Sequence, residues 1–409
     1  MIVRIKRIKL SNIKNVNFGV IEFKNYFSED GYYCSDVVGI YGQNGSGKTA
    51  CLDALNIISL LWRQQDINSY VSDLLQKDTS ESTIDLELSL DGSLATYQVG
   101  LSNVNNVVQI NHEQLTLDEK LLVKYQSNGN KLLHGSWLED NDIKQSALEQ
   151  LIDINSSKSY LFTSDFLALI DNNIMRVLCD YANNQLLVDS LLKDEKHQYL
   201  ELFSFNQQKL NILEPSLIKN PDLKQVNKEI AKFNDVLNNI IPNLNIDLRI
   251  LSSDSEFSKV ELISLREGVV VSLKSESEGI KKLISLVDSL ILLYSNPSVC
   301  LVIDEFDAGI FEYLVGELLQ LVQQRAQGQL IFTSHNLRAL EVLNKDSIVF
   351  TTTNPNNRYL RLSSDDHEDL RKLYYRSINL GGQEEELYNK TSAYKIARAL
   401  KNAGSNNGK

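Results

Sequence analysis

The sequence predicts an α/β fold built on a mostly parallel sheet, and three segments predict it. The apolar run 37–41 is typical of a buried strand, and the glycine-rich segment 42–49 follows it directly. Apolar residues at helical spacing then predict a helix over 50–58. Two further apolar runs, 298–303 and 329–333, end in polar residues and are typical of buried parallel strands. We therefore expect parallel strands whose carboxyl ends carry polar loops.

Residues 42–49 fit the phosphate-binding pattern G-x-x-x-x-G-K-[ST]. Between a strand and a helix, backbone N–H groups and the positive end of the helix dipole cradle a polyphosphate. Lys48 is expected to reach the β- and γ-phosphates, and the Thr49 hydroxyl to bind Mg²⁺. The expected nucleotide-binding residues are Gly42, Asn44, Gly45, Ser46, Gly47, Lys48 and Thr49. The loop predicts that the chain binds a nucleoside triphosphate.

Two other strand ends carry polar residues. Asp304 and Glu305 follow the run 298–303, at the edge where ligands collect in open α/β sheets. We expect Asp304 to bind Mg²⁺ and Glu305 to polarise the attacking water, although such acids also cap helices. His335 follows the run 329–333 and is placed to hydrogen-bond the γ-phosphate. An isolated strand-end histidine is otherwise structural, so its role depends on the order of the three motifs.

That order resembles the ABC-type ATPases, in the RecF/SMC-like branch rather than the transporters. The resemblance implies an ABC-type ATPase head with ATP and Mg²⁺, whose site a second copy completes with a signature Ser-x-Gly. Ser277 and Gly279 fit that signature, although Ser277 alone also fits an ordinary helix cap. Asp307 resembles the D-loop acid that contacts the opposite subunit. The resemblance implies catalytic roles for Lys48, Glu305 and His335.

The resemblance weakens in two places. Segment 160–166 lacks the glutamine of the family's Q-loop, and Thr163 or Ser164 is the candidate replacement as a metal or water ligand. Leu380-Gly381-Gly382-Gln383 is closer to the transporter signature than Ser277 is. It lies C-terminal to His335, on the wrong side of the acidic strand. We therefore expect a turn there, followed by a charged helix over 384–401.

The ATPase head is expected to consist of residues 1–139 and 243–355. An antiparallel lobe is expected at about 80–126, because alternating strands flank the hairpin signal Asp91-Gly92. The alternation in residues 2–23 predicts two strands around a turn.

The rest of the chain is predicted to be helical. Spacing predicts a small helical insertion at 140–242, without the sustained heptads of a coiled coil. Residues 356–409 are expected to form a C-terminal helical extension that ends in a disordered tail from Ala403 onward.

Composition places the chain among globular proteins. Of its 409 residues, 43% are hydrophobic and 23% charged. No apolar run approaches the roughly 20 residues of a membrane span, and the first residues lack a signal-peptide core, so a cytoplasmic location is expected. The cysteines lack metal-binding spacing, and apolar packing is the favoured interpretation for Cys51 and Cys300.

Charge argues against non-specific DNA binding, because the formal net charge is −12. A local basic stretch nevertheless exists at Arg4, Lys6, Arg7, Lys9 and Lys14. Two interpretations are open: contact with phosphates, or charges that protect a strand edge from aggregation. We favour the edge.

The short insertion resembles that of stand-alone AAA family ATPases of bacterial antiphage and abortive-infection systems. This resemblance implies a homodimeric switch that senses a trigger and controls a partner effector, a nuclease or toxin encoded nearby. The alternative is a RecF-like repair or recombination ATPase that binds DNA. A transporter ATPase is disfavoured by the missing Q-loop glutamine, and a nuclease within this chain would have to use the unassigned C-terminal extension.

Overall fold

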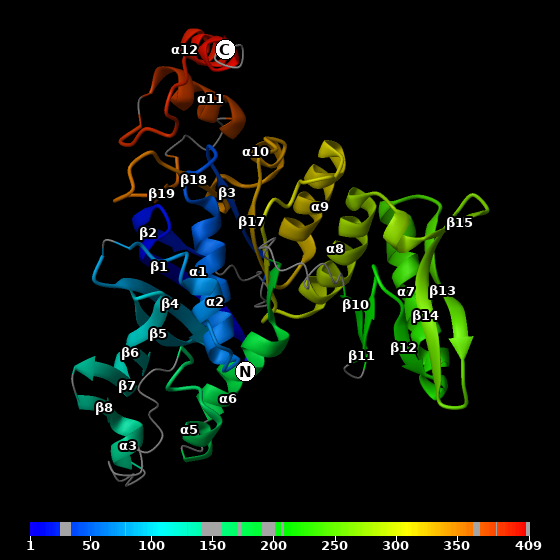
Figure 1. Cartoon of the computed structure of the whole chain (residues 1–409), viewed down its shortest axis with the longest axis horizontal. Helices are drawn as coiled ribbons and strands as arrows, with labels where there is room; N and C mark the ends of the chain where they lie inside the picture. Colours follow the sequence, from blue (N-terminus) through cyan, green and yellow to red (C-terminus); the bar gives the residue numbers. More distant parts are fainter. Residues whose placement is uncertain are drawn as a thin grey trace.

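The computed structural model describes most of the chain in four sheets and the helices around them (Figure 1). The described residues are 1–24, 34–77, 79–128, 130–140, 157–169, 173–189, 201–205, 208–362, 369–381 and 383–405. Among them, none of the helices combines the length and apolar content that crossing a membrane requires.

A six-stranded sheet contains the three segments that predicted the fold. Its order is β19-β18-β3-β17-β16-β9, and all neighbours are parallel except β18 and β19. The strands are β3 (Asp36–Tyr41), β9 (Leu186–Asp189), β16 (Cys300–Ile303), β17 (Gln329–Thr333), β18 (Ile348–Thr351) and β19 (Tyr359–Leu360). Because β17 lies between β3 and β16, the three predicted strands are neighbours and their carboxyl ends meet at one edge of the sheet.

An antiparallel sheet has the order β2-β1-β4-β5-β6-β7-β8. Its strands are β1 (Val3–Ile13), β2 (Val16–Glu22), β4 (Ser82–Leu90), β5 (Ser93–Val104), β6 (Val107–Leu117), β7 (Lys120–Asn128) and β8 (Asn130–His134). Asp91 and Gly92 both have positive φ, 47° and 99°, as a tight two-residue hairpin requires. The strands predicted at 2–23 and in the antiparallel lobe thus join in one sheet.

Both faces of the parallel sheet are covered, because successive residues of its strands enter two apolar clusters. One cluster joins Ile40 and Val302 to the first helix and the antiparallel sheet. The other joins Tyr41 and Ile303 to four later helices. The helices are α1 (Lys48–Trp62) on the first face and α8 (Glu278–Ser295), α9 (Glu312–Arg325), α10 (Ala339–Val342) and α11 (Leu370–Leu380) on the second. Strands covered on both faces read as continuous apolar runs.

A smaller unit packs against α8. Its strands β12 (Ser216–Lys219), β13 (Leu244–Ser253), β14 (Phe257–Arg266) and β15 (Val269–Ser272) pair through β14, and α7 (Leu223–Ile240) covers the sheet. Ile284 and Val287 of α8 belong to the core of this unit. Leu283 and Leu286 of the same helix belong to the core on the parallel sheet. Helix α8 is therefore packed between the two units.

The predicted helical insertion at 140–242 contains strands as well as helices in its described residues. Helix α7 is present, as are α5 (Ser164–Leu169) and α6 (Asn173–Asn184). However, β9 belongs to the parallel sheet, β12 belongs to the smaller unit, and β10 (Glu201–Phe205) forms a hairpin with β11 (Gln208–Asn211). Strands of four or five residues are too short to show a period that distinguishes them from helix.

The C-terminal extension is also less helical than predicted. The expected helix over 384–401 begins only at α12 (Ala393–Ser405), and the preceding residues cross the surface without helical structure. The tail predicted from Ala403 is helical as far as Ser405, and residues 406–409 lie outside the described residues. Gly381 ends α11 with φ 72°, as the turn predicted there requires.

Most side chains of the basic stretch near the N-terminus are paired with other groups of the protein. Strand β1 pairs with both β2 and β4, so the interpretation that these charges protect a strand edge is wrong. Arg4 is fully buried and donates to backbone carbonyl oxygens of Cys34, Pro297 and Gln327. The ion pairs of the others are Arg7 with Glu87, Lys9 with Asp85 and Lys14 with Asp53. Lys6 is exposed.

A buried carboxylate ties the segment before α5 to the antiparallel sheet. Glu113 of β6 is fully buried, and its carboxylate accepts from the hydroxyls of Tyr97 (2.6 Å) and Ser159 (2.5 Å). It also accepts from the backbone N–H groups of Tyr160 (2.9 Å) and Leu161 (3.3 Å). Burial raises the pKa of Glu113, and these hydrogen bonds oppose the shift.

Glu113→Ala should lower the free energy of unfolding by about 3–5 kcal/mol, because it leaves several buried donors without an acceptor. Glu113→Gln should be tolerated far better, since both hydroxyls are able to turn and accept from its amide. Because the folded pKa lies above the unfolded one, the folded state binds the extra proton. The advantage of wild type over Gln should therefore shrink as pH rises through the folded pKa. Urea unfolding of the variants across pH 4–8 measures this, and equal stability of the Ala and Gln variants would contradict the assignment.

Candidate functional site

The phosphate loop lies between β3 and α1, as predicted. Its glycines Gly42, Gly45 and Gly47 have φ of 156°, 76° and 89°, and Gly47 is the residue before the first turn of α1. A Cβ on Gly42 would lie 1.7 Å from Oγ1 of Thr351. Glycine is therefore required both for backbone conformation and for close packing.

Lys48 and Thr49 are the first two residues of α1, and they lie close to the acidic residues that follow β16. Lys48 is 8% exposed, and its ammonium donates to the carbonyl oxygens of Gly42 (3.0 Å) and Gln43 (3.2 Å). Burial lowers the pKa of Lys48, and the carboxylates of Asp304, Glu305 and Asp307 act against that shift. Thr49 Oγ1 donates to Oδ2 of Asp304 at 3.4 Å. The two predicted Mg²⁺ ligands are thus neighbours, and both are oxygen donors, which Mg²⁺ prefers.

Thr333, the last residue of β17, organises the acidic pair. Its hydroxyl donates to Oδ1 of Asp304 and accepts from the backbone N–H of Glu305 at 2.8 Å. Its carbonyl accepts from the N–H of Phe306 at 2.9 Å. The sequence pattern placed His335 after this strand but did not assign Thr333 to the site. Its place at the end of a strand beside the acidic strand was the available signal.

The backbone of Glu305 is held in an uncommon conformation. Its φ is 50°, in the left-handed region that residues with a Cβ rarely adopt. The hydrogen bond to Thr333 fixes its N–H, and the ammonium of Lys282 on α8 donates to its carbonyl oxygen. Such conformations persist only where the surroundings determine them. The exposed carboxylate of Glu305 is therefore presented from a fixed backbone.

His335 and Asp307 meet at the same edge. The backbone N–H of His335 donates to Oδ1 of Asp307 at 3.3 Å, and the histidine is exposed. The N–H of Asn336 donates to the hydroxyl of Ser334 at 2.9 Å, which shapes the turn after β17. The structure thus brings together the phosphate loop, the acidic pair, His335 and Asp307.

Ser277 lies elsewhere on the head. It caps α8, its hydroxyl accepting from the N–H of Ile280 at 3.3 Å, and it is exposed. Helix α8 packs on the face of the parallel sheet opposite to α1 (Figure 1). Gly279 approaches Gly309 so closely that a Cβ on Gly279 would lie 2.1 Å from the Gly309 carbonyl oxygen. The signature candidate is therefore packed against the segment that follows Asp307.

Comparison with known proteins shows the family to which the chain belongs. A family model described as the RecF/RecN/SMC N terminal domain matches residues 13–358. The chain belongs to this family. Its α/β fold is that of an ABC-type ATPase head of the RecF/SMC kind, as predicted. The match ends before α11, so the last two helices lie beyond it.

Solved structures of SMC heads are similar at low identity. An SMC head bound to the C-terminal winged-helix domain of ScpA is 15% identical, with a TM-score of 0.47, over 88% of this chain and 98% of that one. A head with an extended coiled coil, bound to the C-terminal domain of ScpA from Pyrococcus furiosus, is 13% identical with a TM-score of 0.45, over 88% of this chain and 96% of that one. The head from Thermotoga maritima is 15% identical with a TM-score of 0.39, over 88% of this chain and 100% of that one. Comparison with curated proteins finds no match.

The segment proposed to replace the Q-loop of this RecF/RecN/SMC family does not reach the site. Phe162 packs against Trp62 with ring centroids 5.7 Å apart, at the last residue of α1. At 1.5 Å per residue, Trp62 lies about 21 Å along the helix from Lys48. The Thr163 hydroxyl instead accepts from the N–H of Phe166 at 3.2 Å, within the first turn of α5. Neither Thr163 nor Ser164 is placed to bind the metal or water of the predicted site.

Gly279→Ala should lower the free energy of unfolding by about 1–3 kcal/mol, because its Cβ meets rigid backbone at Gly309 rather than a flexible side chain. Gly404→Ala in α12 is the matched control, since nothing lies within 4 Å of a Cβ there. Denaturant unfolding of both variants compares them. Equal stability of Gly279→Ala and wild type would show that the approach of α8 to Gly309 is looser than described.

Proposed function

We propose that this chain is a Mg²⁺-dependent ATPase that works as a dimeric switch. The observation that carries the proposal is the convergence of Lys48, Thr49, Asp304, Glu305 and His335 at one edge of the parallel sheet. Membership of the RecF/RecN/SMC family supports an ATPase head. In this site the phosphate loop would bind the triphosphate, while Thr49 and Asp304 would hold Mg²⁺.

The residues divide the hydrolysis between them. Mg²⁺, when bound, would offset the negative charge on the phosphates. Glu305 would orient a water and take its proton as the water oxygen bonds to the γ-phosphorus. The bond from that phosphorus to the bridging oxygen then breaks, which leaves ADP and phosphate. Lys48 and His335 would stabilise the charge that develops on the transferred phosphoryl group.

The position of Ser277 supports a site that a second copy completes. Its hydroxyl and the N-terminus of the 18-residue helix α8 are exposed, on the opposite face of the sheet from α1. A helix N-terminus favours an anionic ligand. In the proposed dimer, Ser277 and Gly279 of each copy face the γ-phosphate held by the other, beside Asp307. Loss of the γ-phosphate removes that contact and biases the dimer toward opening.

Glu305→Gln should reduce ATP hydrolysis by about 10²–10⁴-fold while ATP binding is retained, because the amide does not accept the proton from water. ATP should then hold the variant in the closed dimer. The measurements are steady-state phosphate release and light scattering after gel filtration with ATP or ADP.

Two further variants make this test specific. Glu312→Gln removes an exposed acid at the start of α9 and should hydrolyse ATP at the wild-type rate. The double variant Glu305→Gln, Ser277→Arg should bind ATP but remain monomeric. Turnover of Glu305→Gln at the wild-type rate would remove Glu305 as the general base, and an ATP-bound dimer of the double variant would remove Ser277 from the interface.

Thr333→Val should lower kcat by about 10–100-fold, because the hydroxyl that orients Asp304 and Glu305 is lost. Thr333→Ser keeps that hydroxyl and should stay within a few-fold of wild type. KM for ATP should change little in both variants, since the phosphate loop is untouched. The rates of the two variants at saturating Mg²⁺ measure this, and similar losses in both would show that the methyl group matters rather than the hydroxyl.

For the cellular role, we propose a sensor or regulatory ATPase of a bacterial antiphage system that controls a partner effector, a nuclease or a toxin. The resemblance to stand-alone defence ATPases supports it. Co-expression with the product of the neighbouring gene and affinity purification in ATP and in ADP test it. A nucleotide-dependent complex is expected, and a homodimer that retains no partner in either state argues against the role.

The alternative, a RecF-like ATPase that binds DNA, loses most of the basic surface that suggested it. Arg4 is fully buried, and Arg7 and Lys9 are paired with carboxylates. The chain also has a net charge of −12. DNA binding that requires ATP and falls steeply with salt would restore this alternative.

A further inference from the structure

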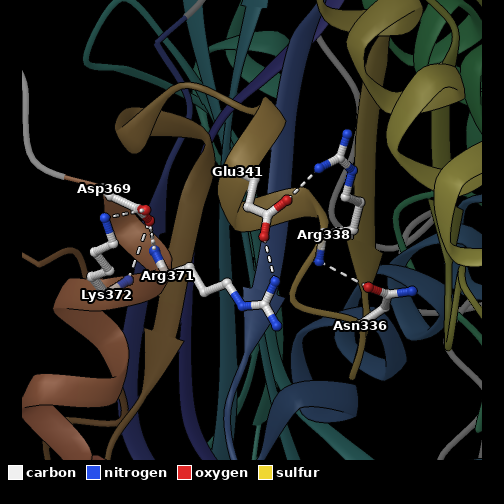
Figure 2. A network of polar contacts seen from close by, with 6 residues as sticks. All are labelled: Asn336, Arg338, Glu341, Asp369, Arg371 and Lys372. Atoms are coloured by element: carbon white, nitrogen blue, oxygen red, sulfur yellow. Dashed lines mark hydrogen bonds and ion pairs between the residues drawn. The ribbon is translucent and has the colours of Figure 1, made fainter.

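The C-terminal extension makes a charged contact with the segment that follows His335. The carboxylate of Glu341 on α10 lies between two guanidinium groups, those of Arg338 and of Arg371 on α11 (Figure 2). These hydrogen bonds lower the pKa of Glu341, so the carboxylate is charged at neutral pH. Helix α11 begins at Leu370, beyond residues 13–358 of the family match. The contact therefore joins the extension to the family head.

Arg338 connects Glu341 to the turn that carries His335, because it contacts both. Its guanidinium lies 4.9 Å from the ring centroid of Tyr313 on α9. Its side chain runs along Gly316, where a Cβ would lie 2.9 Å from its Cγ. Its backbone N–H donates to Oδ1 of Asn336 at 2.8 Å, in the turn directly after His335. Only two residues, Asn336 and Leu337, separate Arg338 from His335, and this hydrogen bond spans them.

The extension is anchored by packing as well as by charge. Leu370 and Leu373 of α11 are buried in the cluster beneath the parallel sheet. Tyr374 stacks on Phe350 with ring centroids 4.9 Å apart. Phe350 lies 6.4 Å from the ring of Tyr41, the residue before the phosphate loop. Helix α11 thus packs on β18 and, through Phe350, beside the end of β3 from which the phosphate loop emerges.

A second contact reaches the phosphate loop directly. The backbone N–H of Asn389 donates to Oε1 of Gln43 at 2.7 Å. The segment that provides it is held by Leu387, which is 3% exposed, and by the N–H of Thr353, which donates to the Glu386 carbonyl oxygen at 2.7 Å. The extension therefore contacts both the phosphate loop and the helix that follows the His335 turn.

We propose that the C-terminal extension is a positioning element of the nucleotide site, in which Arg371 and Glu341 hold the turn that carries His335. This inference rests on the proposed ATPase function. Ground-state ATP binding depends mainly on the phosphate loop, whereas His335 acts on the γ-phosphate. Loosening the turn should therefore lower kcat more than it raises KM.

Arg371→Met and Lys372→Met form a matched pair on α11. Both remove one positive charge from neighbouring positions. Arg371 pairs with Glu341 on α10, whereas Lys372 pairs with Asp369 at the start of its own helix. Arg371→Met should lower kcat by about fivefold, with KM for ATP within about twofold of wild type. Lys372→Met should match wild type, and Arg371→Lys should recover part of the loss because it keeps the charge.

Hydrogen–deuterium exchange of the full chain supplies a readout without turnover. Amides in residues 334–342 should exchange faster in Arg371→Met than in Lys372→Met. If Arg371→Met does not fold, as judged by thermal unfolding, Glu341→Gln is compared with Glu317→Gln, an acid exposed on α9, in the same two measurements. Equal kcat and equal exchange in the matched pair would overturn the proposal.

The design separates this inference from the proposed function. If wild type shows no hydrolysis that depends on Lys48, the ATPase proposal fails. The exchange comparison then still decides whether α11 holds the turn. If hydrolysis is present but exchange and kcat do not differ within the pair, the positioning role fails alone.

Discussion

The register of three neighbouring parallel strands is the constraint on which the site depends. Ile303 of β16 pairs with Phe332 of β17, which in turn pairs with Gly39 of β3. Asp304 therefore leaves its strand level with Thr333, and one hydroxyl is able to bridge Asp304 and Glu305. A shift of one residue would turn every side chain of β17 to the other face. It would replace the Thr333 hydroxyl with a neighbour aimed away from the acids.

Sequence patterns predicted the parts of this arrangement that are local. The strand before the phosphate loop, the helix after it, the two strands with polar ends and the Asp91-Gly92 hairpin all leave a periodic or compositional signal. The parts that depend on distant contacts did not. Strand β9 has four residues and enters the parallel sheet through β16. Two of the carbonyl groups that hold the buried Arg4, those of Pro297 and Gln327, are 293 and 323 residues away in the sequence. Segment 160–166 was wrongly expected to reach the nucleotide site, because the residue that holds it, Glu113, lies on β6 of the antiparallel sheet and is distant in sequence.

The alternation of the parallel strands also explains how the head separates its two helix N-termini. Ile40 and Tyr41 are consecutive, yet one faces the cluster of α1 and the other the cluster of α8. The N-terminus of α1 follows the phosphate loop, whereas that of α8 is capped by Ser277 and packs against Gly309. The fold thus gives each head one N-terminus for its own triphosphate and leaves another, capped by Ser277, exposed. A two-copy arrangement is the economical use of that geometry, in agreement with the proposed switch.

Burial divides the site in the same way. Lys48 and Ser46, which belong to the part that holds phosphate, are 8% and 6% exposed, whereas Glu305, His335 and Ser277 are exposed. Charges in water interact weakly, and electrostatic stabilisation of a transition state needs water to be excluded. This division of burial supports the proposed dimer, in which each head binds its ligand alone and performs chemistry only when a second copy covers the exposed residues. Positioning from the side, through α11 and the turn at His335, then fixes the geometry that such a cover meets.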